Sequence, residues 1–542
     1  MQKGSHMATK SETLKNITEE YLSKIDRMNP PTPADIQTAI LNAVTLQFQL
    51  ENTGRASGSK WSIPISLQPA QIATILLSLY PIVKLSFAGL DRDEEYDVLA
   101  LYQSDGENKG IYVINEKAFH RLIRQYNYEI SRAGLNEVMS VLDENAPRRE
   151  RCKDRDLVAV NNGIFDYKNK MLLPFNPELI FTSKARVNYN VLAQNLIIHN
   201  DDGTDWDFDS WLDEVANHDP ELTQLLWELI GASLRPNVPW NKSAWFLSER
   251  GNNGKGTLCS LIRNVLGKGS HTSIKLDQFG KDFMLEPLIK ACAIITDENP
   301  VGSYLEDASN LKAIITGDSF KTDRKYKTPV ELCFRGLVIQ CVNEMPRVRD
   351  RSESFLRRLL LIPFMQCFTG RERKYIKEDY LKRPEVLEYV LFKVLNMDYY
   401  ELSEPTVCKQ TLAEFRIGND PVAQFVEEML PQSQWDFIPY SFLYALYLAW
   451  FKENCAGNYN YRLGSKPFNR EVRRILETSD EWRALGPTET RKVGNRMNNA
   501  EPLIQRYDLK KWFNPTYFGS DPEKLCHPAI PQGGVRGIER RR

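Results

Sequence analysis

The spacing of apolar residues changes along the chain and divides it into regions. In residues 8–95 they recur at helical intervals, as at Ile36, Ile40, Val44 and Phe48, which predicts a mostly helical N-terminal region. In residues 96–215, short apolar runs alternate with turn signals such as Asn161-Asn162-Gly163, which predicts an α+β accessory domain. In residues 216–403, strand-like runs alternate with amphipathic helices, the order expected of a parallel α/β core.

The remaining segments differ in composition. Residues 404–420 are polar, contain Pro and Gly, and are interpreted as a linker. Residues 421–514 return to a helical pattern, and the Pro- and Gly-rich tail 515–542 is expected to be flexible. Residues 1–7 are interpreted as a remnant of tag cleavage. The prediction is therefore a multidomain α/β protein.

A candidate phosphate-binding loop follows the apolar run Ser243–Leu247 and precedes a helical pattern that ends at Gly267. In such a loop, backbone N–H groups and a helix N-terminus face phosphate oxygens, and a lysine contacts the β- and γ-phosphates. We assign that lysine to Lys255. The residues expected to bind ATP are Gly251, Asn252, Asn253, Gly254, Lys255, Gly256 and Thr257.

Two positions depart from the usual motif of such loops. Glu249 stands where the first glycine is usual, and Gly256 stands where a Ser or Thr usually binds magnesium. Thr257 is therefore the expected source of the Mg²⁺-binding hydroxyl. Taken alone, the segment is also compatible with a surface turn rich in Gly and Asn beside an unpaired lysine.

Two later apolar runs also end in polar side chains. Residues 293–296 lead to Asp297 and Glu298, and residues 337–342 lead to Asn343. Parallel α/β sheets bind ligands at the carboxyl ends of their strands, so these groups are expected to share a crevice with the loop. We expect Asp297 to hold Mg²⁺, Glu298 to orient the attacking water and Asn343 to contact the γ-phosphate. Each segment alone is also typical of an ordinary polar turn.

At these residues the sequence resembles the superfamily 3 helicases, in which a loop of the NGK type, an acidic strand end and a strand ending in Asn occur in this order. Residues 158–167 are similar to the accessory domain of the phage and poxvirus helicase–primase subgroup. Residues 420–425 and 443–450 are similar to its winged-helix region. Within this subgroup the chain is similar above all to the self-loading Rep initiators of staphylococcal pathogenicity islands.

The resemblance implies a fold and an assembly. The fold is a P-loop AAA+-like ATPase core with an α+β N-terminal accessory region and a helical, winged-helix-like C-terminal domain. The assembly is a homo-oligomeric ring, expected to be a hexamer, that uses ATP and Mg²⁺. An arginine finger, Arg357 or Arg358, is implied to reach the γ-phosphate held by the neighbouring subunit.

Two basic clusters are candidate DNA contacts. By resemblance, the segment before Asn343 forms a DNA-contacting hairpin in the pore of the ring, and it supplies cations and an aromatic ring for single-stranded DNA through Arg324, Lys325, Tyr326 and Lys327. Later, Arg470, Arg473 and Arg474 share one helical face and are expected to bind origin duplex DNA. For both clusters a solvated charged surface is the alternative.

Composition narrows these interpretations. The chain has 542 residues and a formal net charge of −1, so DNA contacts must come from local clusters. Its nine cysteines form no CxxC pair, which disfavours a zinc site and fits a cytoplasmic protein. No apolar run is long enough to suggest a membrane span.

We therefore predict an ATP-dependent replicative DNA helicase that translocates on single-stranded DNA, with self-loading at an origin as a further expectation. One alternative is an origin-binding initiator whose ATPase only switches the assembly state, as Glu249 and Gly256 suggest. Another is a primase–helicase fusion. The fusion is disfavoured because spaced metal-binding carboxylates are missing, the nearest acidic run being residues 91–95.

Overall fold

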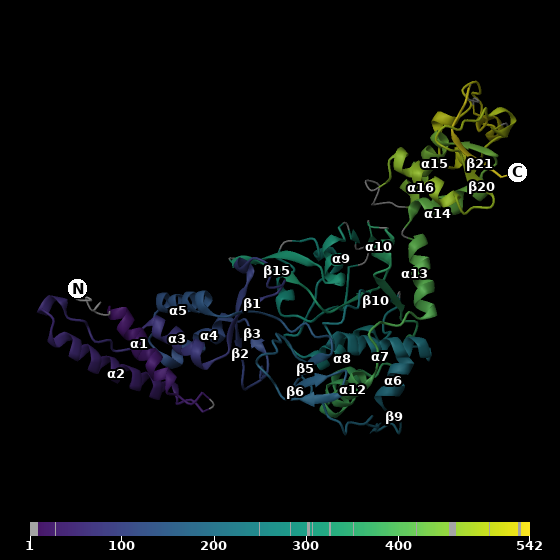
Figure 1. Cartoon of the computed structure of the whole chain (residues 1–542). Coiled ribbons are helices and arrows are strands. Elements are labelled where there is room, and N and C mark those ends of the chain that lie inside the picture. The colour runs from purple at the N-terminus through teal and green to yellow at the C-terminus, as the bar shows by residue number, and fades with distance from the viewer. Residues whose placement is uncertain are drawn as a thin grey trace. The chain divides into compact units, whose positions relative to one another are not determined.

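Figure 1 shows a computed structural model of the chain. The structure describes residues 9–541 except 28, 249, 282, 301–303, 306, 325–326, 349, 351, 419, 455–461, 498 and 529–532, and it describes only the backbone of 304, 327, 328, 347, 417, 418 and 495. The chain divides into two compact units, Met1–Thr411 and Leu412–Arg542. Within the described ranges, no helix combines the length and apolar character needed to cross a bilayer.

The first unit begins with helices and a small sheet that share one core. The helices are α1 (Lys10–Ser23), α2 (Pro33–Thr53), α3 (Pro69–Leu79), α4 (Glu116–Tyr126) and α5 (Arg132–Asn145). The sheet has the order β3-β2-β1-β4, formed by β1 (Ile82–Ser86), β2 (Val98–Tyr102), β3 (Tyr112–Val113) and β4 (Arg148–Glu150). Ile36, Ile40, Val44 and Phe48 form the fully buried face of α2.

This core differs from the predicted division at residue 95. One apolar cluster extends from Leu14 to Leu142, so the helices before residue 95 and the elements after it belong to a single part. The physical reason is β1, a strand within the region predicted to be helical, which pairs with β2 and β4 from the following region. Pairing between strands distant in sequence is not visible in local apolar spacing.

A second part of the first unit connects this core to the parallel sheet. It contains the antiparallel strands β5 (Leu157–Val160), β6 (Gly163–Asp166) and β7 (Met171–Leu173). The short hairpin of β8 (Ile198–His199) and β9 (Asp205–Trp206) follows, and then α6 (Phe208–Val215) and α7 (Pro220–Leu234). Their apolar residues join the cluster that surrounds the parallel sheet.

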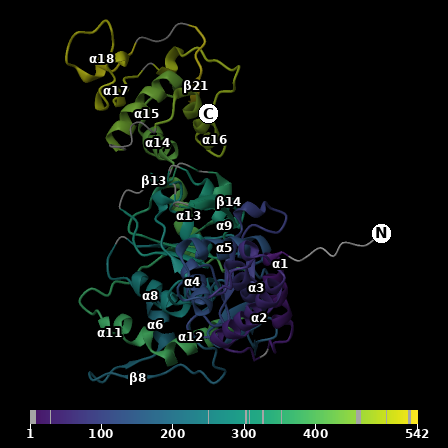
Figure 2. The ribbon, with the colours of Figure 1, turned by 90° about the vertical axis from the view of Figure 1, so that its left-hand side faces the viewer.

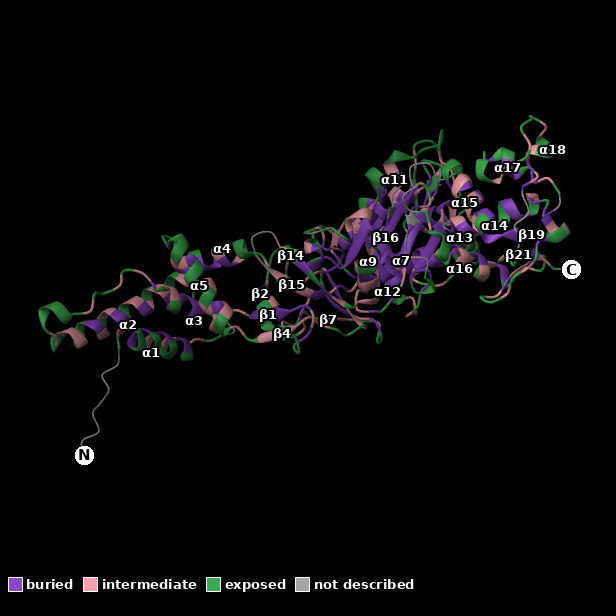
Figure 3. Cartoon of the chain, turned by 90° about the horizontal axis from the view of Figure 1, so that it is seen from above, coloured by how far each residue is buried: buried purple, intermediate pink, exposed green. Residues whose placement is uncertain are grey.

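The centre of the first unit is a five-stranded sheet of order β11-β12-β16-β10-β18, in which every neighbouring pair is parallel. The strands are β10 (Ser243–Leu247), β11 (His271–Thr272), β12 (Ala293–Thr296), β16 (Leu337–Val342) and β18 (Leu359–Pro363). All residues of β12 and β16 are buried (Figure 3). Their continuous apolar sequences follow from burial on both faces. The predicted mixed α/β architecture with a parallel sheet is confirmed.

Helices and smaller strands surround this sheet. The helices are α8 (Lys255–Leu266), α9 (Ser309–Thr316), α10 (Glu353–Leu356), α11 (Lys374–Glu378) and α12 (Pro384–Asn396). A hairpin of β14 (Ser319–Arg324) and β15 (Lys327–Cys333) precedes β16, and β13 (Tyr304–Leu305) pairs with β17 (Arg347–Val348). The segment predicted as a linker, residues 404–420, is mostly the helix α13 (Thr406–Gly418).

The second unit contains helices around a three-stranded antiparallel sheet of order β19-β21-β20. Its elements are α14 (Pro421–Met429), β19 (Phe437–Pro439), α15 (Tyr440–Asn454), α16 (Ser465–Leu476), β20 (Trp482–Ala484), α17 (Leu503–Arg506), α18 (Pro522–Leu525) and β21 (Gly537–Arg540). The tail 515–542 was expected to be flexible, whereas β21 is the central strand of this sheet. Four residues that pair with two distant strands are too short a segment for local patterning to identify.

Candidate functional site

The loop between β10 and α8 has the backbone geometry of a tight turn. Asn252 and Gly254 have φ values of +53° and +89°, in the left-handed region. Gly254 is the N-cap of α8, and a Cβ there would lie 3.2 Å from both γ-carbons of Val215. The left-handed conformation therefore favours glycine at Gly254, and a Cβ there would also require the Val215 side chain to shift. The helix is held in place by its apolar face of Leu258, Leu261, Ile262 and Val265.

Lys255 lies at the start of α8 and is directed toward the ends of two neighbouring strands. Its side-chain Nζ donates hydrogen bonds to Asn343 Oδ1 at 2.9 Å, to the Val342 carbonyl at 3.0 Å and to the Ser248 carbonyl at 3.2 Å. The residue is 6% exposed, and burial lowers the pKa of its ammonium group. The structure thus places the predicted lysine and the predicted polar strand end in direct contact.

The two predicted acids follow β12 and are both exposed. Asp297 forms an ion pair with Arg263 of α8, with Nη1 and Oδ2 2.6 Å apart, and Arg263 also donates to the Ile295 carbonyl at 2.9 Å. Glu298 makes no such pair among the described residues. Arg263 was missed by the sequence reasoning, because nothing in the motif places a partner for Asp297 on the helix after the loop.

Asn299, also missed, fixes the turn that carries the acids. Its Oδ1 accepts from the Leu276 N–H at 2.8 Å, and its Nδ2 donates to Gln340 Oε1 and to the Cys341 carbonyl, both at 3.0 Å. The side chain is 4% exposed, so its hydrogen-bonding capacity is used within the protein. Asn299 therefore anchors the segment of Asp297 and Glu298 to β16.

The two candidate finger arginines differ in their surroundings. Arg358 donates to Ser354 Oγ at 2.7 Å and also to the Ser354 carbonyl. Arg357 is exposed, and its guanidinium has no partner among the described residues. Its backbone carbonyl accepts a hydrogen bond from Lys242 Nζ at 2.8 Å, which fixes the backbone and leaves the side chain available.

The β14–β15 hairpin carries the predicted contacts for single-stranded DNA. Arg324 is 14% exposed and lies 3.7 Å from Glu286, so this guanidinium is engaged within the protein. Lys325 and Tyr326 lie outside the described residues, as does the side chain of Lys327. The base of the hairpin contacts the N-terminal part of the unit, where the Cys333 N–H donates to the Phe87 carbonyl at 3.2 Å.

The three predicted duplex contacts lie on α16 in the second unit, and their side chains differ. Arg473 Nε donates to the Tyr440 hydroxyl at 3.2 Å. Arg474 pairs with Glu471 at 2.8 Å and with Asp420 at 3.4 Å. Arg470 is exposed and has no partner among the described residues. Of the three guanidiniums, that of Arg470 is thus the one available to a ligand.

A cavity of about 430 Å³ opens beside the loop. One side is formed by the loop and the first turn of α8. The other is formed by the segment from Phe368 to Glu378, whose α11 lies near α8 (Figure 2). The Phe368 N–H donates to the Asn252 carbonyl at 2.7 Å, and Asn252 Nδ2 donates to Glu372 Oε1 at 3.0 Å. The sequence reasoning did not single out this segment.

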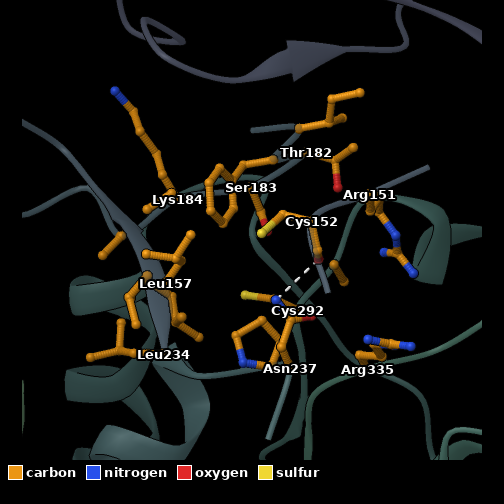
Figure 4. A pocket seen from close by; sticks show the side chains of 18 residues that line it. Arg151, Cys152, Leu157, Thr182, Ser183, Lys184, Leu234, Asn237, Cys292 and Arg335 are labelled. Carbon is orange, nitrogen blue, oxygen red and sulfur yellow. Dashed lines mark hydrogen bonds between the residues drawn. The ribbon is translucent and has the colours of Figure 1, made fainter. Parts of the chain in front are cut away.

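A smaller cavity of about 50 Å³ lies elsewhere in the unit, and none of the predicted site residues lines it (Figure 4). Cys152, Asn237 and the guanidinium-bearing Arg151 and Arg335 surround it, with Asn237 Nδ2 donating to the Cys152 carbonyl at 3.1 Å. Burial and the nearby Arg335 lower the pKa of Arg151 to about 10. Among the described residues, no cluster of three or more His, Cys, Asp or Glu side chains is placed to bind a metal ion.

Three segments of the chain match family models. Residues 90–217 match a model described as D5 N terminal like, residues 246–358 match a family of unknown function (DUF5906), and residues 417–514 match a model described as Poxvirus D5 protein-like. The predicted resemblance to the phage and poxvirus helicase–primase subgroup is therefore supported, by D5-like models, for the segments on either side of the loop and strand ends.

Comparison with solved structures finds apo structures of the NrS-1 C terminal region. One has 11% sequence identity and a TM-score of 0.39, with 88% of this chain and 100% of that chain covered. Another has 12% identity and a TM-score of 0.40, with 87% and 99% covered. No curated protein matches the chain.

Proposed function

We propose that the chain is an ATP-hydrolysing DNA helicase whose central sheet is a P-loop AAA+-like motor. The observation that carries this proposal is the position of Lys255. Its buried ammonium lies at the start of α8 and contacts Asn343 at the end of the adjacent strand. A buried lysine at a helix N-terminus, beside a polar strand end, is placed to bind phosphate oxygens. The D5-like segments support a role in DNA replication.

The residues present fit a nucleoside triphosphate with magnesium. The backbone N–H groups of Gly251 to Thr257 would surround the phosphates, with Lys255 on the β- and γ-phosphates. Thr257 and Asp297 would hold Mg²⁺, whose positive charge stabilises the charge that develops during phosphoryl transfer. Glu298 would orient the attacking water, because it is exposed and free of ion pairs with described residues.

The proposed assembly is a ring in which the neighbouring subunit supplies a further cation to the γ-phosphate. Arg357 fits the role of a finger acting on the neighbouring subunit better than Arg358, because the Arg358 guanidinium is already bonded to Ser354. The similarity to superfamily 3 helicases, and within them to the Rep initiators of staphylococcal pathogenicity islands, supports a hexamer. The pore of that ring would hold single-stranded DNA against the β14–β15 hairpin.

Duplex DNA would bind to the second unit. Its three-stranded antiparallel sheet and helices α14 to α16 fit a winged-helix-like domain, and the apolar face of α16 is buried at Phe468, Val472 and Leu476. The opposite face of α16 presents Arg470 to solvent. Recognition of an origin by this face would let the protein load itself there.

One observation favours a second candidate function. Asp297, the expected Mg²⁺ ligand, is paired with Arg263, and Gly256 occupies the position of the usual hydroxyl ligand. Weak magnesium binding would give slow turnover. An initiator that uses ATP only to switch its assembly state tolerates slow turnover, whereas a translocating motor does not.

ATP hydrolysis and unwinding of a forked duplex, measured on the same samples, test the proposal. Lys255→Ala is expected to lose both activities while keeping its fold. Lys268→Ala, which removes an exposed lysine just beyond the other end of α8, is the matched control and should keep both. Hydrolysis and unwinding that persist in Lys255→Ala would refute the assignment of the loop.

A further inference from the structure

The cavity beside the loop has an apolar wall that phosphate binding does not require. Trp211 of α6 and Ile376 of α11 are 6% and 8% exposed, and the half-buried Phe368 lines the same cavity. The Phe368 ring also lies against the loop itself, because a Cβ built on Gly254 would be 3.7 Å from Phe368 Cε2. Phosphates gain nothing from such a wall, whereas a flat, largely apolar group does.

The position of the wall is fixed by polar contacts to the loop. The Phe368 N–H and the Asn252 carbonyl are 2.7 Å apart, and Asn252 Nδ2 lies 3.0 Å from Glu372 Oε1. Arg371 pairs with Glu214 at 3.6 Å, and its guanidinium lies 5.2 Å from the centre of the Phe368 ring. These contacts connect α6, the loop and the segment before α11 into one pocket. Its volume of about 430 Å³ falls in the range of roughly 300–1,000 Å³ usual for small-molecule sites.

Basic side chains slightly outnumber acidic ones around the cavity, which is lined by Arg371, Arg373, Lys374 and Lys377 and by Glu214, Glu372 and Glu378. The side chains of Arg373, Lys374 and Lys377 form no hydrogen bond or ion pair with described residues. Lys377 Nζ would lie 3.9 Å from a Cβ on Gly256, so this lysine approaches the first turn of α8. The N-terminus of a helix carries partial positive charge that disfavours a neighbouring lysine, and an anion bound between them would make the arrangement favourable. The missing side chain at Gly256 leaves room for that anion.

We propose that this cavity binds the base and ribose of the nucleoside triphosphate, with Phe368 and Ile376 against the base and Lys377 on the phosphate side. The inference rests on the proposed nucleotide-binding function and adds the direction in which the nucleotide lies. The base points toward α6 and α11 and away from β12. This orientation also accounts for the glycine at position 256, because the absence of a side chain there keeps the approach of Lys377 open.

Binding of ATP and of inorganic tripolyphosphate to the full-length protein, by calorimetry in magnesium buffer, tests this orientation. Tripolyphosphate carries the phosphates without base or ribose. Phe368→Ala should weaken ATP binding about fivefold to tenfold, as expected for a lost aromatic contact, and should leave tripolyphosphate binding unchanged. Lys377→Ala should weaken both ligands by similar factors. Phe518→Ala, which removes a 96% exposed phenylalanine of the second unit, is the control and should change neither.

Lys255→Ala separates this inference from the proposed function. If the wild type binds both ligands, Lys255→Ala binds neither, and Phe368→Ala affects both ligands equally or not at all, the base site is overturned while the phosphate loop stands. If the wild type binds neither ligand, both proposals fail.

A second measurement does not depend on the folding of any variant. Photolysis of the wild-type protein with azido-ATP, in which the reactive group is on the base, should label peptides that contain Trp211 or residues 368–378. Competition by unlabelled ATP should remove the label. Competed labelling confined to peptides from β11 or β12 would place the base on the other side of the loop and overturn the inference.

Discussion

The last strand of the second unit contains one buried carboxylate, and removing its charge should lower the free energy of unfolding of this unit. The Glu539 side chain is 6% exposed and lies in β21, the central strand of the sheet. It pairs with Arg483, Arg496 and Arg491, the last at 3.3 Å between Nε and Oε2. Glu539→Gln keeps the shape of the side chain and removes the charge that these guanidiniums share.

The expected cost follows from burial. Removing one partner of a buried ion pair costs about 3–5 kcal/mol. The side chains of Arg483 and Arg491 are 38% and 33% exposed, so solvent screens part of this effect. We therefore expect the free energy of unfolding of the second unit to fall by about 2–3 kcal/mol. Glu489→Gln is the matched control, because Glu489 contacts Arg483 and Arg491 but is 41% exposed, and it should cost less than about 1 kcal/mol.

Hydrogen exchange of the full-length protein measures this difference locally. Backbone amides of β19, β20 and β21 should exchange about thirtyfold faster or more in Glu539→Gln, since 1.36 kcal/mol corresponds to about a factor of ten. Amides of the parallel sheet in the first unit should be unchanged. Equal exchange in Glu539→Gln and Glu489→Gln, or no change in either, would refute the role of the buried carboxylate.

The stabilisation that Glu539 contributes should depend on pH. Burial alone would raise the pKa of Glu539, but hydrogen bonds from Arg496, Arg491 and Arg483 outweigh it and lower that pKa below the ordinary value. A carboxyl group with a lowered folded-state pKa contributes its stabilisation above the unfolded-state pKa, and the contribution is lost as the pH falls through the folded-state pKa. The difference in exchange between wild type and Glu539→Gln should therefore shrink below about pH 4.

Further predictions concern the proposed motor. Glu298→Gln should bind ATP and assemble but hydrolyse ATP at least about a hundredfold more slowly, because it loses the group that orients water; near-normal turnover in a steady-state assay would reassign that role. Arg357→Ala should lower turnover per assembled ring about a thousandfold while Arg358→Ala has a smaller effect, and the reverse order would exchange the two. Arg470→Ala should weaken duplex binding and reduce by about one the slope of log affinity against log salt concentration. Arg474→Ala should act mainly on stability, because the charge of Arg474 is already paired. Equal slopes for Arg470→Ala and wild type would show that Arg470 does not contact DNA.

The sequence predicted the strands at whose ends the candidate site residues lie. The apolar runs that became β10, β12 and β16 are buried on both faces, so their composition alone identifies them. Each polar group that follows such a run has a position fixed by the strand order. The sequence therefore predicted a shared crevice for Lys255 and Asn343, whereas the direct hydrogen bond between them was not predicted.

The contacts that the sequence did not predict depend on side chains brought together by tertiary packing. Arg263 is half-buried and lies outside the apolar face of α8, which alone has a recognisable spacing, and its pairing with Asp297 has no local signal. Phe368 and Ile376 lie in a short segment with no motif, and this segment contacts the loop through the hydrogen bond from the Phe368 N–H to the Asn252 carbonyl. β21 was missed because its pairing partners lie far away in the sequence.

The central claim is that ATP bound at Lys255 drives strand separation, and displacement of a labelled strand from a forked duplex tests it most directly. We predict that the wild-type protein displaces the strand only with hydrolysable ATP and magnesium, and that Lys255→Ala displaces none at equal protein concentration. ATP hydrolysis by the wild type without any displaced strand, on forks of either polarity, would contradict the claim and favour the assembly switch.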